Sequence, residues 1–224
     1  MPAHHASRSR SSLPLLPAVL CGVALIASPS WATGDYPQLQ RLDASSSVPG
    51  SNVGRSVAVA GGRVLVGSPR FDGGPGVDSG GAWLFDATTG AELFELVPSD
   101  GAAGDFFGQA VAMAGTTVAV GANRHALAGV SEGAVYLFDA TTGQQTAKIV
   151  ASDGQSGDWF GFAVALHGDH LLVGAPLRDP VGANSGGAYL FEVSSGLELG
   201  VLVPGAVAAG DRSGSSVGLS AERI

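Results

Sequence analysis

The sequence predicts an all-β fold made of β-propeller blades, each a unit of four antiparallel strands that repeats about every 53 residues. Short segments recur at a fixed spacing along the chain. Each recurring segment is four to six residues long and rich in Val, Leu and aromatic residues, and Gly, Asp, Ser or Pro separates it from the next. Four-stranded units of this length without intervening helices are typical of propeller blades.

The first strand of each unit follows a glycine and alternates small with larger residues. The glycines are spaced by 54, 53 and 53 residues and are Gly54, Gly108, Gly161 and Gly214. The runs that follow them are residues 55–60, 109–114, 162–167 and 215–220. Ala and Ser occupy one side of these runs, which suits a surface where neighbouring sheets approach closely.

The other three strands differ in how much charge they carry. The second strand is apolar on both faces, which predicts a position in the middle of the sheet, and covers residues 64–69, 118–123 and 171–176. The third strand ends on an aromatic residue, a leucine and a phenylalanine, and covers residues 81–85, 133–138 and 187–191. The fourth strand includes Glu95 and Lys148, so we expect it at the outer edge, where charge discourages strand addition, over residues 93–97, 146–150 and 199–203.

Tight hairpins should join the third strand to the fourth. Their sequences are Asp-Ala-Thr-Thr-Gly at 86–90 and 139–143 and Glu-Val-Ser-Ser-Gly at 192–196. The acidic residue can accept backbone hydrogen bonds, and the glycine can adopt a positive φ.

Residues 1–32 have the pattern of a secretory signal peptide. Arg8 and Arg10 precede an apolar run from Leu13 to Ile26, and Ser30 and Ala32 are small residues suited to cleavage after Ala32. The apolar run is too short for a membrane-spanning helix, and lipidation at Cys21 is a minor alternative. Because Cys21 is the only cysteine, the mature chain should have no disulfide and lie outside the cytoplasm, at the cell surface, in the periplasm or secreted.

The repeats divide the rest of the chain. After a linker at 33–38 we expect a partial blade at 39–53, full repeats at 54–107, 108–160 and 161–213, and a truncated repeat at 214–224. Residues from Leu39 onwards align with the fourth strand of a blade. Because a closed ring needs about four to eight blades, we expect an incomplete ring that is part of a longer propeller.

Composition excludes a nucleic-acid surface. The net charge is −8, and only 11 of 224 residues are Lys or Arg, which leaves no basic cluster for phosphate contacts. The hydrophobic content of 45% is enough to form a core, so the many glycines should mark turns of a folded chain.

The recurring motifs resemble the FG-GAP repeats of integrin α-subunit propellers and their bacterial relatives. Phe107-Gly108 and Phe160-Gly161 supply the Phe-Gly pair, and Gly174-Ala175-Pro176 supplies Gly-Ala-Pro. Near matches stand at 67–69 and 121–123, and the linkers 99–105 and 152–158 look like the bacterial branch. The resemblance covers residues 39–224 and implies a propeller, an extracytoplasmic setting and a binding role.

We do not transfer the calcium site of integrin-type repeats to this chain. That site needs several oxygen ligands on a loop between the first two strands. Here the connections are the short turns 60–62, 114–116 and 167–169, with Asp169 as the single acid. No metal-binding, cofactor-binding or catalytic residue is therefore predicted, although the resemblance leaves calcium possible.

Other suggestive residues have simpler explanations. Ser216 lies in a Gly-x-Ser-x-Gly match at the start of a strand, where the strand–turn–helix of a nucleophile elbow is not expected. His167 and His170 flank a turn without further metal ligands, and His125 is expected to be solvated in a loop. The period-matched aromatic residues are expected to pack between blades, and the acids to cap turns or face solvent. The aromatics are Trp83, Phe106, Tyr136, Trp159 and Tyr189, and the acids are Asp72, Asp78, Asp100, Asp105, Asp153 and Asp158.

The sequence favours a secreted or surface-exposed, non-enzymatic module that binds an extracellular protein or glycan. Its longer loops, 68–80, 122–132 and 175–186, differ while the strands repeat, as expected of a scaffold that carries variable sites. The alternative is a fragment of a propeller enzyme whose catalytic residues lie elsewhere, because the Asp-Ala-Thr-Thr-Gly hairpins also resemble those of quinoprotein propellers.

Overall fold

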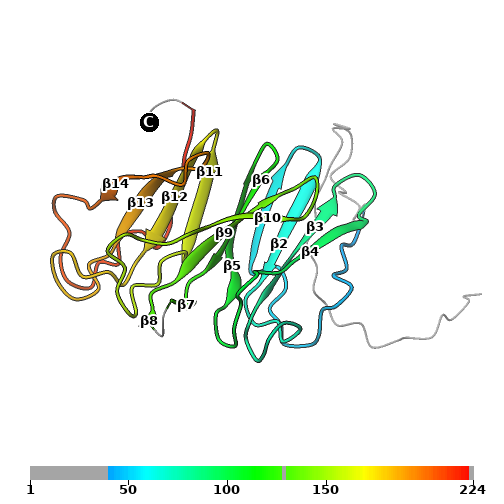
Figure 1. Cartoon of the computed structure of the whole chain (residues 1–224), viewed down its shortest axis with the longest axis horizontal. Helices are drawn as coiled ribbons and strands as arrows, with labels where there is room; N and C mark the ends of the chain where they lie inside the picture. Colours follow the sequence, from blue (N-terminus) through cyan, green and yellow to red (C-terminus); the bar gives the residue numbers. More distant parts are fainter. Residues whose placement is uncertain (1–39, 128–129, 222–224) are drawn as a thin grey trace, which may run out of the picture.

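The computed structural model describes residues 40–127 and 130–221, so the predicted signal peptide and the linker at 33–38 lie outside the described residues. Within these ranges the fold is all-β and contains no helix. Three four-stranded sheets stand side by side in chain order, from right to left in Figure 1. The arrangement is that of a partial propeller without a closed ring.

Each sheet, here called a blade, consists of four antiparallel strands. Blade 1 holds β1 (Ser56–Ala60), β2 (Arg63–Ser68), β3 (Gly81–Asp86) and β4 (Glu92–Leu96). Blade 2 holds β5 (Phe107–Ala114), β6 (Thr117–Ala122), β9 (Ala134–Asp139) and β10 (Gln145–Ile149). Blade 3 holds β11 (Ala163–His167), β12 (His170–Ala175), β13 (Gly187–Glu192) and β14 (Glu198–Leu202). A small hairpin of β7 (Ala126–Leu127) and β8 (Val130–Ser131) lies between β6 and β9.

The strand order within each blade follows the predicted order. The apolar second strands β2, β6 and β12 lie in the middle, and the fourth strands β4, β10 and β14 form the outer edges. The pairing register also repeats, because Leu84 faces Phe94 and Leu137 faces Ala147 at the same place in blades 1 and 2. The equivalent pair in blade 3 is Leu190 and Gly200.

Edge-to-face aromatic contacts fill the core of blades 2 and 3. The buried ring of Phe107 lies 5.7 Å from the ring of Tyr136 and 5.9 Å from that of Phe138, at steep interplanar angles. In blade 3, Phe160 contacts Tyr189 at 5.3 Å in the same way. Such pairs add stabilisation beyond the burial of apolar area. The Phe of each Phe-Gly pair therefore anchors the start of its blade to the third strand.

Neighbouring blades touch through pairs of glycines. A Cβ atom added to Gly121 would lie 2.0 Å from the carbonyl oxygen of Gly161, well inside van der Waals contact. Gly67 faces the carbonyl oxygen of Gly108 in the same way, at 2.3 Å. Only glycine leaves room for this approach, and Gly161 also has a φ of +87°, which favours glycine. The glycines of the recurring motifs thus set the spacing between blades.

Backbone hydrogen bonds join the blades next to these glycines. The Phe107 amide donates to the carbonyl of Ser79 at 3.1 Å, and the Phe160 amide donates to that of Glu132 at 3.0 Å. Because each donor belongs to one blade and each acceptor to the loop of the preceding blade, the bonds align consecutive sheets.

The two ends of the described chain differ from the sequence prediction. Residues 40–44, aligned with a fourth strand, and residues 217–220, aligned with a first strand, form no strand. A strand needs a ladder partner, and the described residues provide none for either segment. Ser45, which follows the first segment, nevertheless keeps a contact of the repeat. Its amide donates to Glu92 at 2.7 Å, as the Ser152 amide does to Glu198 at 3.0 Å.

The hairpins between third and fourth strands form as predicted. Asp86 accepts hydrogen bonds from the amides of Thr88 at 2.9 Å and Thr89 at 2.7 Å, and these bonds hold the pKa of Asp86 below its ordinary value. The glycine that closes each hairpin, such as Gly143, has a φ of about 70°.

Replacing Gly121 by Ala should lower the free energy of unfolding by about 2 to 4 kcal/mol, because the added methyl group overlaps the backbone of Gly161. Urea unfolding followed by circular dichroism measures the effect. Gly200→Ala is the matched control, since a Cβ there meets no atom within 4 Å, and it should be neutral or slightly stabilising. Equal effects of the two substitutions would contradict the role given to the glycine contact.

Candidate binding site

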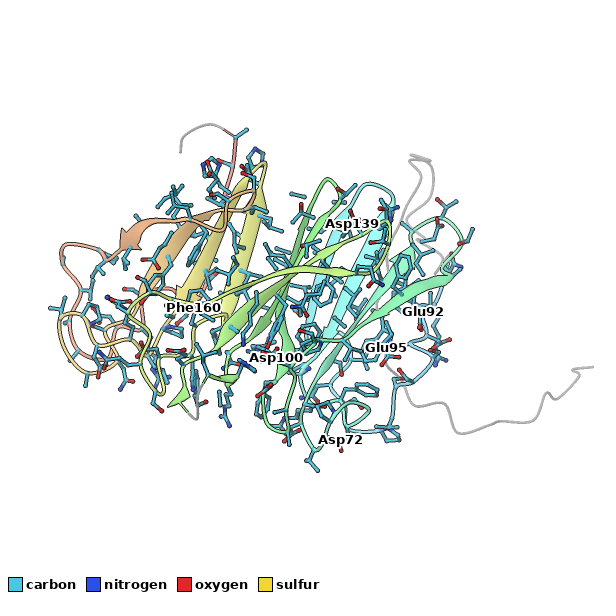
Figure 2. The ribbon with its side chains drawn as sticks, in the orientation of Figure 1. Asp72, Glu92, Glu95, Asp100, Asp139 and Phe160 are labelled. Atoms are coloured by element: carbon cyan, nitrogen blue, oxygen red, sulfur yellow. The ribbon has the colours of Figure 1, made fainter. Side chains whose placement is uncertain are left out.

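The variable loops gather at one end of the three sheets. We call this end the loop face and define it as residues 69–80, 97–106, 123–127, 130–133, 150–160 and 176–186. It includes β7 and β8 at the lower edge of Figure 1, and Figure 2 shows Asp72 at the same edge with Asp139 on the opposite side. The hairpins between third and fourth strands therefore lie at the other end.

Arg124 lies between two aromatic rings on the loop face. Its guanidinium carbon is 4.6 Å from the ring centroid of Phe106 and 5.5 Å from that of Trp159. Trp159 in turn stacks on Phe162, with centroids 5.7 Å apart and an interplanar angle of 14°. Arg124 is exposed and the three rings are half-buried. The cluster therefore presents one cation, bordered by half-buried aromatic rings, to solvent.

The two rings beside Arg124 stand on left-handed backbone. Phe106 has a φ of +56° and Trp159 a φ of +60°, and Asn52 has the same conformation at the same repeat position. Asn adopts this region readily, whereas a bulky residue there is strained by about 1 kcal/mol or more. The turn itself therefore does not require an aromatic residue, and strained residues of this kind concentrate at functional sites.

His125 is buried below this cluster, so the prediction that it is solvated is wrong. Its residue exposure is 4%, and its Nδ1 lies 2.8 Å from Oδ2 of Asp105, which is also buried. Nε2 lies 2.7 Å from the Nζ of Lys148. A lysine ammonium only donates hydrogen bonds, so Nε2 accepts and Nδ1 carries the proton given to Asp105. The ring is thereby fixed in one tautomer.

Asp100 completes the polar group around Lys148. It accepts hydrogen bonds from the Tyr136 hydroxyl at 2.8 Å and from the Lys148 ammonium at 2.7 Å. Burial raises the pKa of Asp100, but the Lys148 and Tyr136 bonds outweigh burial and hold that pKa below its ordinary value. The same contact recurs in blade 3, where the Tyr189 hydroxyl donates to Asp153 at 2.7 Å.

In every blade, the residue at the repeat position of His125 packs against the aromatic residue of the third strand. Phe71 meets the ring of Trp83 at 5.0 Å, and His125 meets that of Tyr136 at 5.7 Å, both edge-on. In blade 3 the guanidinium of Arg178 lies over Tyr189. Three different side chains thus cover the third-strand aromatic from the loop face. This recurrence indicates that the residue at this position supports the loop.

Comparison with protein families agrees with the repeat structure. A model of the FG-GAP repeat matches residues 92–138 and 144–191. The chain contains FG-GAP repeats. Each match runs from the fourth strand of one blade through the third strand of the next. No curated protein matches the chain significantly.

The FG-GAP motifs correspond to the contacts between blades. The Phe of each Phe-Gly pair is buried in the core. The carbonyl group of the following Gly points toward the preceding blade. There it contacts the Gly of the Gly-Ala-Pro motif or of its near match. The prediction of packing between blades holds for Trp83, Tyr136 and Tyr189 only as far as burial, because their edge-on ring contacts are to Phe71, Phe107 and Phe160 of their own blades. Phe106 and Trp159 depart from that prediction, because they flank an exposed arginine. The repeat alignment marked both positions, but no sequence signal identified Arg124 as their partner.

The acids predicted to cap turns divide into two groups. Asp105 accepts the amide of Ala102 at 2.8 Å and Asp158 accepts that of Gln155 at 2.9 Å, so these two cap their turns. Asp72 likewise accepts the amide of Asp78 at 2.8 Å within its own loop. Asp100 and Asp153 instead bind the tyrosine hydroxyls of the following blade, a contact that the sequence did not predict.

The side chains of the remaining motifs do not gather into a catalytic or metal-binding arrangement in the described part of the chain. Ser216 is exposed in an irregular segment, and His167 pairs with His170 across the turn between β11 and β12. Among residues 40–127 and 130–221, no three His, Cys, Asp or Glu side chains are grouped so that they could hold a metal ion. The connections between first and second strands are tight turns, as expected from their length.

Asp100→Asn should lower the free energy of unfolding at pH 7 by up to about 1 kcal/mol, because the half-exposed carboxylate loses its charge pair with Lys148. The folded-state pKa of Asp100 is lowered, so this stabilisation exists above the ordinary aspartate pKa of about 3.9 and is lost as the pH falls below it. Urea unfolding at pH 7 and pH 3 measures the difference. A gap between wild type and variant that stays constant with pH would contradict the assignment.

Proposed function

We propose that this FG-GAP protein is a non-enzymatic extracytoplasmic module whose loop face binds acidic glycans. The observation that carries the proposal is the exposed Arg124 between the rings of Phe106 and Trp159. A guanidinium recognises a carboxylate through paired hydrogen bonds, and aromatic faces offer rigid apolar contact at low entropic cost. Together they fit a sugar ring that carries a carboxylate.

The scaffold supports this use of the loop face. Arg124 lies just after β6 and Trp159 just before β11, and backbone hydrogen bonds tie the cluster to neighbouring turns. The Arg124 amide donates to the carbonyl of Asp105, and the Phe106 amide donates to that of Asp78. Sites held by rigid elements keep their geometry without the entropic cost of ordering a loop on binding.

Two further observations favour binding outside the cytoplasm over catalysis. Residues 1–32 have the sequence pattern of a secretory signal peptide. His125, the described residue that comes closest to a catalytic base, is inaccessible, since its side chain is only 5% exposed. A substrate on the surface would not reach its ring nitrogens.

An oligosaccharide array tests the proposal on the full chain. Wild type should bind oligosaccharides that contain uronic acids more strongly than their neutral counterparts. Arg124→Ala and Trp159→Asn, which copies the residue type of Asn52, should each weaken this binding at least tenfold while circular dichroism stays unchanged. Arg70→Ala is the matched control, because Arg70 has the repeat position of Arg124 in blade 1, beside Asn52.

Two outcomes would overturn the proposal. Wild-type binding by both Arg124→Ala and Trp159→Asn would exclude the aromatic–arginine cluster as the site. Failure of the wild type to bind any acidic oligosaccharide on the array would exclude the glycan assignment itself.

A further inference from the structure

A cavity opens between blades 2 and 3 at the end opposite the loop face. Its volume is about 460 Å³, within the range of small-molecule sites. Leu137, Ala147 and Ile149 of blade 2 form one wall, and Ser194, Ser195 and Gly196 of the blade 3 hairpin form the other. Asp139, labelled in Figure 2 on the side away from Asp72, also borders the opening.

The equivalent place between blades 1 and 2 is filled by an aromatic ring. Phe94 has the repeat position of Ala147, because Phe94 pairs with Leu84 as Ala147 pairs with Leu137. The Phe94 ring lies against the hairpin glycine of the next blade, so that a Cβ on Gly143 would come within 2.7 Å of the ring. A phenyl group therefore fits the space between a fourth strand and the following hairpin.

Ala147 removes this ring and leaves the space open. Gly196 is the counterpart of Gly143, yet a Cβ on Gly196 would meet only the Cδ1 atom of Ile149, at 3.8 Å. The spacing of the blades is set by the glycine contacts beside the inner strands, such as Gly121 against Gly161. These contacts lie away from the cavity and do not depend on residue 147. The sheets cannot collapse to close the gap, so the missing ring becomes a cavity.

The walls combine apolar and polar groups. Leu137 and Ile149 of blade 2 are buried and apolar, whereas Ser194 and Ser195 on the hairpin side and Thr117 at the start of β6 carry hydroxyl groups. The Ser194 hydroxyl donates to Asp169 and the Ser195 hydroxyl to Glu192, so both retain lone pairs that can accept a hydrogen bond. A ring that carries a donor group could use both kinds of wall.

We propose that this cavity is a binding site for a benzenoid ring with a hydrogen-bonding substituent. The ring takes the place that Phe94 occupies at the preceding interface, and the substituent reaches the hairpin hydroxyls. Such a ring could come from a free phenolic compound or from a tyrosine side chain of a bound peptide. The site is separate from the loop face and does not depend on the function proposed for that face.

Fluorine NMR with 4-fluorophenol as the probe tests the site. Wild type should broaden and shift the probe signal in a saturable manner, with a dissociation constant of about 1 mM, as expected for a ligand of this size. Ala147→Phe should abolish the saturable shift and raise the melting temperature, because it supplies the missing ring. Ala147→Ser, which keeps the cavity open, is the matched control and should bind as wild type does.

A second variant reproduces the site elsewhere in the same chain. Phe94→Ala should open an equivalent cavity beside Gly143 and double the number of bound probe molecules. A second titration, with N-acetyltyrosinamide, separates the two sources of the ring. An affinity similar to that for 4-fluorophenol would show that the cavity accommodates the peptide groups around a tyrosine. A much weaker affinity would favour a free phenolic compound. No saturable binding of 4-fluorophenol to wild type, or binding unchanged in Ala147→Phe, would overturn the proposal.

Discussion

The structure depends on the contact between glycine backbones of consecutive blades. Gly121 meets the carbonyl of Gly161, and Gly67 meets that of Gly108, at distances that no side chain would permit. This approach brings the first strands of neighbouring sheets together and places each Phe-Gly phenylalanine within its own blade. Because the contact involves backbone atoms, it has the same geometry at every interface, whatever the other side chains are.

Repetition of this contact leaves other repeat positions free to vary, and the candidate sites arise there. The position before the Phe-Gly phenylalanine can be Asn52, Phe106 or Trp159 on the same left-handed backbone. The position facing the hairpin glycine can be Phe94 or Ala147. One set of variations produces half-buried aromatic rings beside an exposed arginine, and the other produces a cavity.

The sequence predicted the strands, hairpins and blade order because those features depend on local patterns that recur three times. It could not predict the burial of His125, which results from Asp105 and Lys148 approaching from the linker and the outer strand. The partners of Arg124 were missed for the same reason. Comparing side chains across consecutive repeats, with Phe94 set against Ala147, is the sequence signal that could have indicated the cavity.

Residue-resolved amide hydrogen exchange tests the coupling of the blades most directly. The amides of Phe107 and Phe160 bridge consecutive blades, whereas those of Val120 and Val173 lie within sheets. If the glycine contacts unite the blades, all four amides should exchange through the same global opening, with similar free energies and similar dependence on denaturant. Rapid exchange of Phe107 and Phe160 while the sheet amides stay protected would show that the blades open independently and would contradict the account.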